Sequence, residues 1–196
     1  MSEFSSSSSG NSAPSIYDKS LLRPRGSVAL STFSFIFSEM VQYFQLRSNS
    51  VEDLERKLEE AGFGIGQRMS ELVAVREKLT RRETRIESML FFVQNTVWKH
   101  LFNKEADNLE KSNDDDDEYM IYENSPITNI FVSVPDDMGS FNCAAFLAGV
   151  ISGLLVASNF DAKVTAHTLS GEGGAADKTV FLVKFSRDVM ERPGIH

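Results

Sequence analysis

Residues 27–46 read SVALSTFSFIFSEMVQYFQL, and the apolar side chains in this stretch recur at the spacing of an α-helix. The widest apolar arc of the predicted helix is unbroken over roughly 160°. Val28, Phe35 and Leu46 form a second apolar ridge almost opposite this arc, and Glu39 is the only charged residue. A surface helix of a monomer normally has one charged face, so the pattern predicts a helix that is covered on more than one side.

Two arrangements would cover such a helix. Its own domain can cover one side while a partner chain covers another, or the helix can lie at the centre of a single core. We favour the partner interface, because a domain of this size rarely encloses a helix completely.

A second predicted helix follows directly. Asn49-Ser50 interrupts the first helix, and Ser50-Val-Glu-Asp53 has the form of a helix-capping signal. The two helices would form an αα-hairpin, which is able to dock on a counterpart from another subunit as a four-helix arrangement. The residues expected at this interface are Leu30, Phe33, Ile36, Phe37, Met40, Phe44, Val51, Leu54 and Leu58.

The segment that follows, residues 62–66, reads GFGIG and predicts a sharp turn. It does not match a nucleotide-binding loop, because no strand precedes it and no Lys-Ser/Thr pair follows it. A third helix is expected over residues 66–76. The longest helical pattern covers residues 83–102 and predicts a core helix.

The second half of the chain changes to strand-like periodicity. Gly149 and Gly153 within a predicted helix indicate close packing, because glycine costs a helix about 1 kcal/mol. Strands in adjacent pairs favour an antiparallel sheet. We therefore predict an α+β fold, with a layer of four helices followed by a twisted four-stranded antiparallel sheet and one further helix between the strand pairs. The expected strands are 119–122, 127–134, 163–169 and 178–185, and the further helix is 142–158.

We expect one domain over residues 16–190. It would include an acidic loop at about 108–118 and a Gly-rich loop at about 170–177. Residues 1–15 are rich in serine and are expected to be disordered, and residues 191–196 are expected to form a loose tail.

The overall composition excludes several classes of protein. The chain has 196 residues and a net charge of −8, which argues against a nucleic-acid binder. Cys143 is the only cysteine, so no internal disulfide is possible and a reducing compartment is expected. The N-terminus lacks the apolar core of a signal peptide. The most apolar run, Phe146–Ala157, is too short to cross a bilayer. We therefore expect a cytosolic protein.

No group of residues predicts an enzyme or a bound cofactor. His100, His167 and His196 are scattered, and none has a second ligand at metal-binding spacing. Cys143 begins a predicted helix, but no histidine accompanies it, so a hydrolase using this nucleophile has no supporting spacing. The run of four Asp residues lacks the pattern of a calcium loop. No catalytic, cofactor-binding or metal-binding residue is assigned.

A basic segment joins the third and fourth predicted helices. In an acidic protein it forms a local positive patch that could meet anionic lipid headgroups or an acidic partner. The alternative is a solvated junction between helices. The residues of this basic segment are Arg76, Lys78, Arg81, Arg82 and Arg85.

Four stretches carry a family resemblance. They are LLRPRGSVALSTFSFIFSEMVQYF (21–44), GFGIGQRMSEL (62–72), RRETRIESMLFFVQNTVWKHLFNKEAD (81–107) and NCAAFLAGVISGLL (142–155). Together they resemble the small-subunit family of the transport protein particle (TRAPP), with the Bet-three-type fold, and look most like its subunit-five branch. The similarity runs from about Ser15 to Phe185.

The resemblance implies a helical layer on a twisted four-stranded antiparallel sheet, and pairing between subunits through their first two helices. It implies a complex that tethers vesicles and exchanges nucleotide on Rab GTPases, peripheral at cis-Golgi and ER–Golgi membranes. This branch is implied to be an architectural, non-catalytic subunit bound to the acyl-bearing subunit three and to a longin-fold subunit. Exchange activity would belong to the assembled complex.

One departure from the family concerns acylation. In the acylated branch a cysteine precedes the Glu-Thr pair of the segment that matches residues 77–85, which here read EKLTRRETR. We therefore expect no acylation at this position. The second functional hypothesis is a small-molecule binding module, which would hold an acyl chain or similar ligand in a cavity under the Phe-rich helices.

Overall fold

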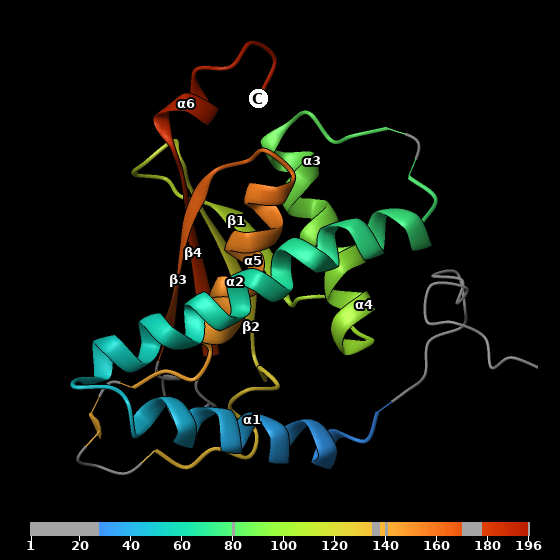
Figure 1. The fold of residues 1–196 in the computed structure, drawn as a ribbon. Helices are drawn as coiled ribbons and strands as arrows, with labels where there is room; N and C mark the ends of the chain where they lie inside the picture. The colour runs from blue at the N-terminus through green and yellow to red at the C-terminus, as the bar shows by residue number, and fades with distance from the viewer. Residues whose placement is uncertain (1–27, 80, 135–137, 140, 170–177, 196) are drawn as a thin grey trace, which may run out of the picture.

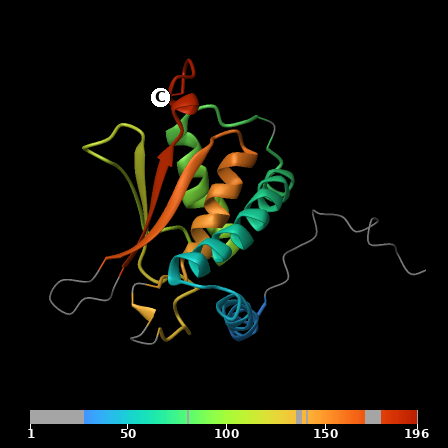
Figure 2. The same cartoon turned by 60° about the vertical axis from the view of Figure 1, so that its left-hand side comes forward.

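A computed structural model describes residues 28–79, 81–134, 138–139, 141–169 and 178–195. Its helices cover one face of an antiparallel sheet, so the predicted α+β fold is confirmed (Figures 1 and 2). The elements are α1 (Leu30–Gln45), α2 (Val51–Arg76), α3 (Ile86–Phe91), the π-helical segment η2 (Phe92–Val97), α4 (Trp98–Phe102), β1 (Asn108–Lys111), β2 (Glu118–Glu123), α5 (Ala145–Ala157), β3 (Ala162–Leu169), β4 (Lys178–Phe185) and α6 (Arg187–Met190).

The sheet has the strand order β1-β2-β4-β3, and every neighbouring pair is antiparallel. Ile121 of β2 pairs with Phe181 of β4, and Val183 of β4 pairs with Val164 of β3. All four side chains are buried. Along β2, buried residues such as Ile121 alternate with half-buried ones, as the two-residue period of a strand requires.

The predicted strand over 127–134 is wrong. The start of this segment is a turn, in which the Asn129 amide donates to the Pro126 carbonyl oxygen at 2.9 Å. The fourth strand is β1, which lies inside the segment expected to be an acidic loop. Its NLEK sequence has little strand propensity, and pairing with β2 makes it a strand.

The glycine-rich segment over residues 62–66 is not a turn. It lies in the middle of α2, so the expected second and third helices are one continuous helix. Gly62 and Gly66 face α5 so closely that a Cβ on either would lie 2.0 or 2.1 Å from an α5 carbonyl oxygen. Glycine is therefore required here for the contact between two helices.

The glycines of α5 make the reciprocal contact. A Cβ on Gly149 would lie 2.0 Å from the Glu59 carbonyl oxygen, and one on Gly153 would lie 2.1 Å from the Phe63 carbonyl oxygen. The close packing predicted for the helix over 142–158 is therefore confirmed, and α2 is what it packs against.

A buried carboxylate joins the end of the long predicted helix to the sheet. The Trp98 ring packs edge-on against Phe181 at 5.8 Å, and its Nε1 donates to Glu123 Oε2 at 2.9 Å. Glu123 is only 1% exposed and also accepts a hydrogen bond from Lys104. This cluster fixes α4 on β2 and β4.

The end of the described chain is packed against α3. Ile195 is buried, and its carbonyl oxygen accepts a hydrogen bond from the Ile86 amide at 2.9 Å. The expectation of a loose tail over 191–196 therefore fails at Ile195. The Ser-rich segment 1–15 and the Gly-rich loop 170–177 lie outside the described residues.

Candidate protein interface

Helix α1 is anchored to the rest of the domain by aromatic side chains along one side. Phe37 is 3% exposed, stacks on Phe33 at 5.6 Å and meets Phe146 of α5 edge-on at 5.4 Å. In both ribbon views α1 lies at the lower end of the molecule, beyond α2 (Figures 1 and 2). One side of the helix is therefore covered by its own chain.

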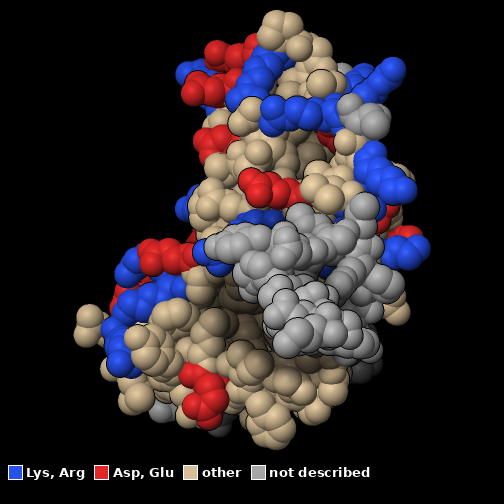
Figure 3. Space-filling view, turned by 45° about the vertical axis from the view of Figure 1, so that its right-hand side comes forward, with Lys and Arg blue, Asp and Glu red and all other residues tan. Residues whose placement is uncertain are grey.

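The opposite side of α1 is apolar and exposed. Phe35 is 75% exposed, Ile36 is 67% exposed and Leu46, directly after the helix, is 85% exposed. Val28 and Tyr43 are also mostly exposed. We call these five residues the outer α1 face. Figure 3 shows mainly uncharged surface at this lower end of the molecule. An exposed apolar surface of this kind is typical of a protein interface.

The structure divides the residues predicted at the interface into three groups. Three are buried in the core of this chain, which corrects their assignment: Phe37, Leu54 and Leu58. Four are half-buried against that core: Phe33, Met40, Phe44 and Val51. Only Leu30 and Ile36 are exposed. Most of the wide apolar arc packs inward, because it has the larger area to bury. Ile36 and Tyr43 at one edge of the arc stay exposed, together with the ridge of Val28, Phe35 and Leu46.

A polar cluster fixes the connection between α1 and α2. Lys57 Nζ donates to Asp53 Oδ2 at 2.8 Å, to Ser48 Oγ at 3.3 Å and to the Arg47 carbonyl oxygen. Ser50 Oγ accepts the Asp53 amide at 3.2 Å, so the predicted helix cap is confirmed. The hydrogen bond from Lys57, with a smaller effect from that of Arg56, lowers the pKa of Asp53 to about 2. The connection therefore keeps its ion pairs at all physiological pH values.

The basic segment lies where α2 ends. Lys78, Arg81, Arg82 and Arg85 are exposed and Arg76 is half-buried. The Arg82 guanidinium donates to the Ser158 carbonyl oxygen at 3.3 Å, at the end of α5. Arg76 lies in the last turn of α2, 26 residues long, whose other end joins the connection to α1. The candidate anionic-surface patch is therefore separate from the outer α1 face.

Cys143 is buried in a position that disfavours its thiolate. It is 2% exposed, and burial, with a smaller effect from Glu55, raises the pKa of its thiol to about 12. A thiol with such a pKa stays protonated near neutral pH, and only the thiolate is a good nucleophile. Within the described chain no side chain hydrogen-bonds to this thiol, and His167 contacts Thr165 instead.

We expect Cys143 of the native protein to resist iodoacetamide at neutral pH, and to react fully after unfolding in concentrated guanidinium chloride. Burial and the raised pKa both slow the native reaction. Intact-mass spectrometry would count the added groups over time. Rapid labelling of the folded protein, with circular dichroism unchanged, would contradict the buried position.

A family model described as transport protein particle (TRAPP) component matches residues 33–186. The chain belongs to the TRAPP component family. The match includes most of α1 and all of the helices and strands from α2 to β4, and only α6 lies beyond it.

Two TRAPP relatives are similar over nearly their whole length. The trafficking protein particle complex subunit 5 of Dictyostelium discoideum is 49% identical, over 90% of this chain and 95% of the relative. The human subunit of the same name is 42% identical, over 90% of both chains. The resemblance to the subunit-five branch is thereby confirmed, and the chain has the role of a TRAPP complex subunit in trafficking.

A solved TRAPP structure has the same fold. It is a trafficking protein particle complex subunit 3 from Naegleria fowleri, covalently bound to palmitic acid, and it superposes with a TM-score of 0.68. The two proteins are 17% identical, over 80% of this chain and 95% of the other. In the present protein, no helix among the described residues combines the length and the hydrophobicity needed to span a membrane.

Proposed function

We propose that this chain is a non-catalytic, architectural TRAPP subunit that binds a neighbouring subunit through the outer α1 face. The supporting observation is the row of large apolar side chains that no described residue of the chain covers. Apolar area in water costs about 25 cal/mol per Å², so burying this row against another protein is favourable. The polar cluster around Lys57 holds the row in place before binding.

The partner would supply a similar helix pair, so that two hairpins pack as a four-helix arrangement. On this proposal the neighbours are TRAPP subunit three and a longin-fold subunit. Nucleotide exchange on Rab GTPases is a property of the assembled complex. The subunit works at the surface of cis-Golgi and ER–Golgi membranes, through that complex.

The double variant Phe35→Asp with Leu46→Asp tests the interface. We expect its affinity for separately purified subunit three to fall at least about tenfold, because two charges would enter an apolar contact. The melting temperature of the isolated variant should stay close to that of the wild type, since both side chains are exposed. Isothermal titration calorimetry gives the affinity.

Leu169→Asp is the matched control, because Leu169 is an exposed apolar residue on β3 and lies outside the outer α1 face. It should bind subunit three like the wild type. Equal affinity of the double variant and the wild type would reject this interface.

The acyl-chain alternative has weaker support in this chain. A hollow of about 610 Å³ lies beside Phe91 and Phe92, but it is open to solvent and is bordered by the carboxylates of Glu83 and Glu87. Two carboxylates at its edge do not suit a hydrocarbon chain. A stoichiometric lipid mass in native mass spectrometry of the purified protein would nevertheless favour this alternative.

We further propose that the basic segment contacts anionic membrane lipids. Val75 and Leu79 are exposed apolar residues within the same stretch, so apolar and basic groups are presented together. The charge-reversal variant Arg81→Glu with Arg82→Glu should lower flotation with phosphatidylserine vesicles several-fold, and neutral vesicles should bind neither protein. Flotation unaffected by charge reversal would contradict this proposal.

A further inference from the structure

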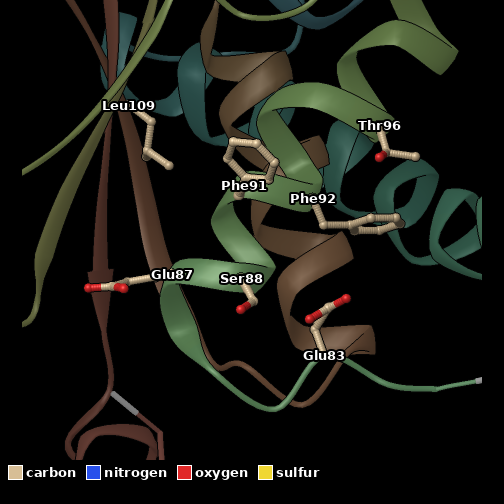
Figure 4. A pocket seen from close by; sticks show the side chains of 7 residues that line it. All are labelled: Glu83, Glu87, Ser88, Phe91, Phe92, Thr96 and Leu109. Atoms are coloured by element: carbon tan, nitrogen blue, oxygen red, sulfur yellow. The ribbon is translucent and has the colours of Figure 1, made fainter.

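The hollow between α3 and the sheet edge has features of a second protein-binding site. It measures about 610 Å³ and lies between the outer side of α3–η2 and strand β1. Figure 4 shows Ser88 between the carboxylates of Glu83 and Glu87 at one end, while Phe91 and Leu109 lie farther along. We call this hollow the α3–β1 groove.

The groove exposes aromatic surface that the fold does not use. Phe91 is 62% exposed, although it belongs to a helix whose other side packs into the core. Phe92 and Leu109 beside it are half-buried and offer further apolar contact. An apolar side chain of a ligand would therefore find partners on both the helix and the strand.

The charge of the groove determines what would accompany that apolar side chain. Glu83 and Glu87 form no ion pair with any described residue, and both are exposed. The nearby Lys111 pairs with Asp116 at 2.9 Å, and it interacts with Glu87 only through space, without an ion pair. Glu83 is flanked in sequence by Arg82 and Arg85 of the basic segment, but Glu83 and Glu87 are the charged side chains that line the groove. Two carboxylates without an ion pair at this end favour a ligand that brings a positive charge to them.

The sheet edge determines the shape of the ligand. β1 is an edge strand that pairs with β2 alone among the described strands, so no described strand pairs with its other edge, where the Leu109 amide donates only to its neighbour Asn108 Oδ1 at 2.9 Å. An extended segment can add to such an edge by main-chain hydrogen bonds. Residues two apart in an extended segment point to the same side, so one can contact Phe91 while the next reaches Glu83 or Glu87.

We propose that the α3–β1 groove binds an extended segment of another protein in which an apolar residue and a Lys or Arg stand two positions apart. The segment adds a fifth strand beside β1. Its apolar side chain packs on Phe91 and Leu109, and its basic side chain pairs with the two carboxylates. This site is independent of the outer α1 face.

Three synthetic peptides test the proposal with the full chain. One carries a Leu-Thr-Arg-Thr-Leu core, one has Glu in place of Arg, and one has the same composition as the first with Leu and Arg adjacent. Fluorescence anisotropy should show binding of the first peptide, with at least about tenfold weaker binding of the other two. The double variant Glu83→Lys with Glu87→Lys should reverse the preference between the Arg and Glu peptides.

Phe91→Ser should weaken binding of the first peptide several-fold, while Phe35→Asp should leave it unchanged, which separates this site from the interface of the proposed function. No binding of the first peptide, or binding that the charge-reversal variant does not alter, would overturn the proposal. A dimer of the wild-type chain that Phe91→Ser dissociates would also overturn it, and would assign the groove to a second copy.

Discussion

Gly66→Ala is expected to destabilise the domain by on the order of 3 kcal/mol or more, or to prevent folding. The added Cβ would lie 2.1 Å from the Val150 carbonyl oxygen and 2.9 Å from the Leu154 amide nitrogen. Both atoms are backbone, so no side chain can rotate away, and α2 and α5 would have to separate. Inserting extra atoms into a packed core typically lowers the free energy of unfolding by roughly 1–3 kcal/mol. A clash with rigid backbone lies at the upper end of that range or beyond it.

Gly64→Ala is the matched control in the same helix. A Cβ there meets no atom within 4 Å, so only the helix propensity changes. Alanine is better than glycine in a helix by about 1 kcal/mol, and this variant should therefore be slightly more stable than the wild type. Urea unfolding followed by circular dichroism gives both free energies. Similar midpoints for Gly66→Ala and Gly64→Ala would show that the two helices do not approach as described.

Glu123→Leu is expected to lower the free energy of unfolding by about 3 kcal/mol. The Trp98 Nε1–H and the Ser125 amide, which donate to this carboxylate at 2.9 and 3.0 Å, would both lose their acceptor. Lys104 would lose its partner as well, but its side chain is 45% exposed, so water would replace much of that interaction.

Glu123→Gln separates the hydrogen bond of Trp98 from the other contacts of the carboxylate. The glutamine oxygen can still accept from Trp98, but its NH2 group would then replace Oε1, which accepts from the Ser125 amide and from Lys104. We therefore expect a loss of about 2 kcal/mol, smaller than that of Glu123→Leu. The same urea titration measures this loss. Titrations of Trp98→Phe alone and of Trp98→Phe combined with Glu123→Gln complete a double-mutant cycle, which gives the coupling free energy between the two residues. Equal losses for Glu123→Leu and Glu123→Gln would mean that the Trp98 hydrogen bond contributes little and that the contacts of Oε1 with Lys104 and Ser125 carry the effect.

The helix content could be predicted from apolar periodicity, but the glycines misled the prediction. Gly62, Gly64 and Gly66 lie close together, which normally indicates a turn. The useful signal was the spacing of four residues between Gly62 and Gly66, which recurs between Gly149 and Gly153. Residues four apart lie on one side of a helix, so two such pairs indicate two helices in close contact.

The strands show a limit of local patterns. Residues 127–134 are rich in apolar and β-branched side chains, yet they form a turn and an irregular segment. Asn108–Lys111 has no such pattern and is a strand. Pairing with β2 across the hairpin makes these residues a strand. The strand propensity of a segment by itself does not show whether such a partner is present.

The helix at the candidate interface could be identified from sequence, but its exposed side could not. A helix with two apolar sides is expected to be covered on both of them. The pattern does not show which side packs against its own chain and which side is left for a partner. The aromatic contact between Phe37 and Phe146 decides this, and those residues are more than 100 positions apart. The α3–β1 groove was missed for the same reason, because Leu109 and Phe91 belong to separate elements.

The glycine contact between α2 and α5 also governs what happens at the surface. Sliding either helix by one residue would put a side chain where only a hydrogen atom fits, so the crossing permits a single alignment. Helix α5 carries Phe146, which receives Phe37, and this ring pair sets the rotation of α1 about its own axis. A mutation deep inside the protein could therefore redirect the exposed row of Phe35 and Ile36, and so abolish assembly in a molecule that still folds.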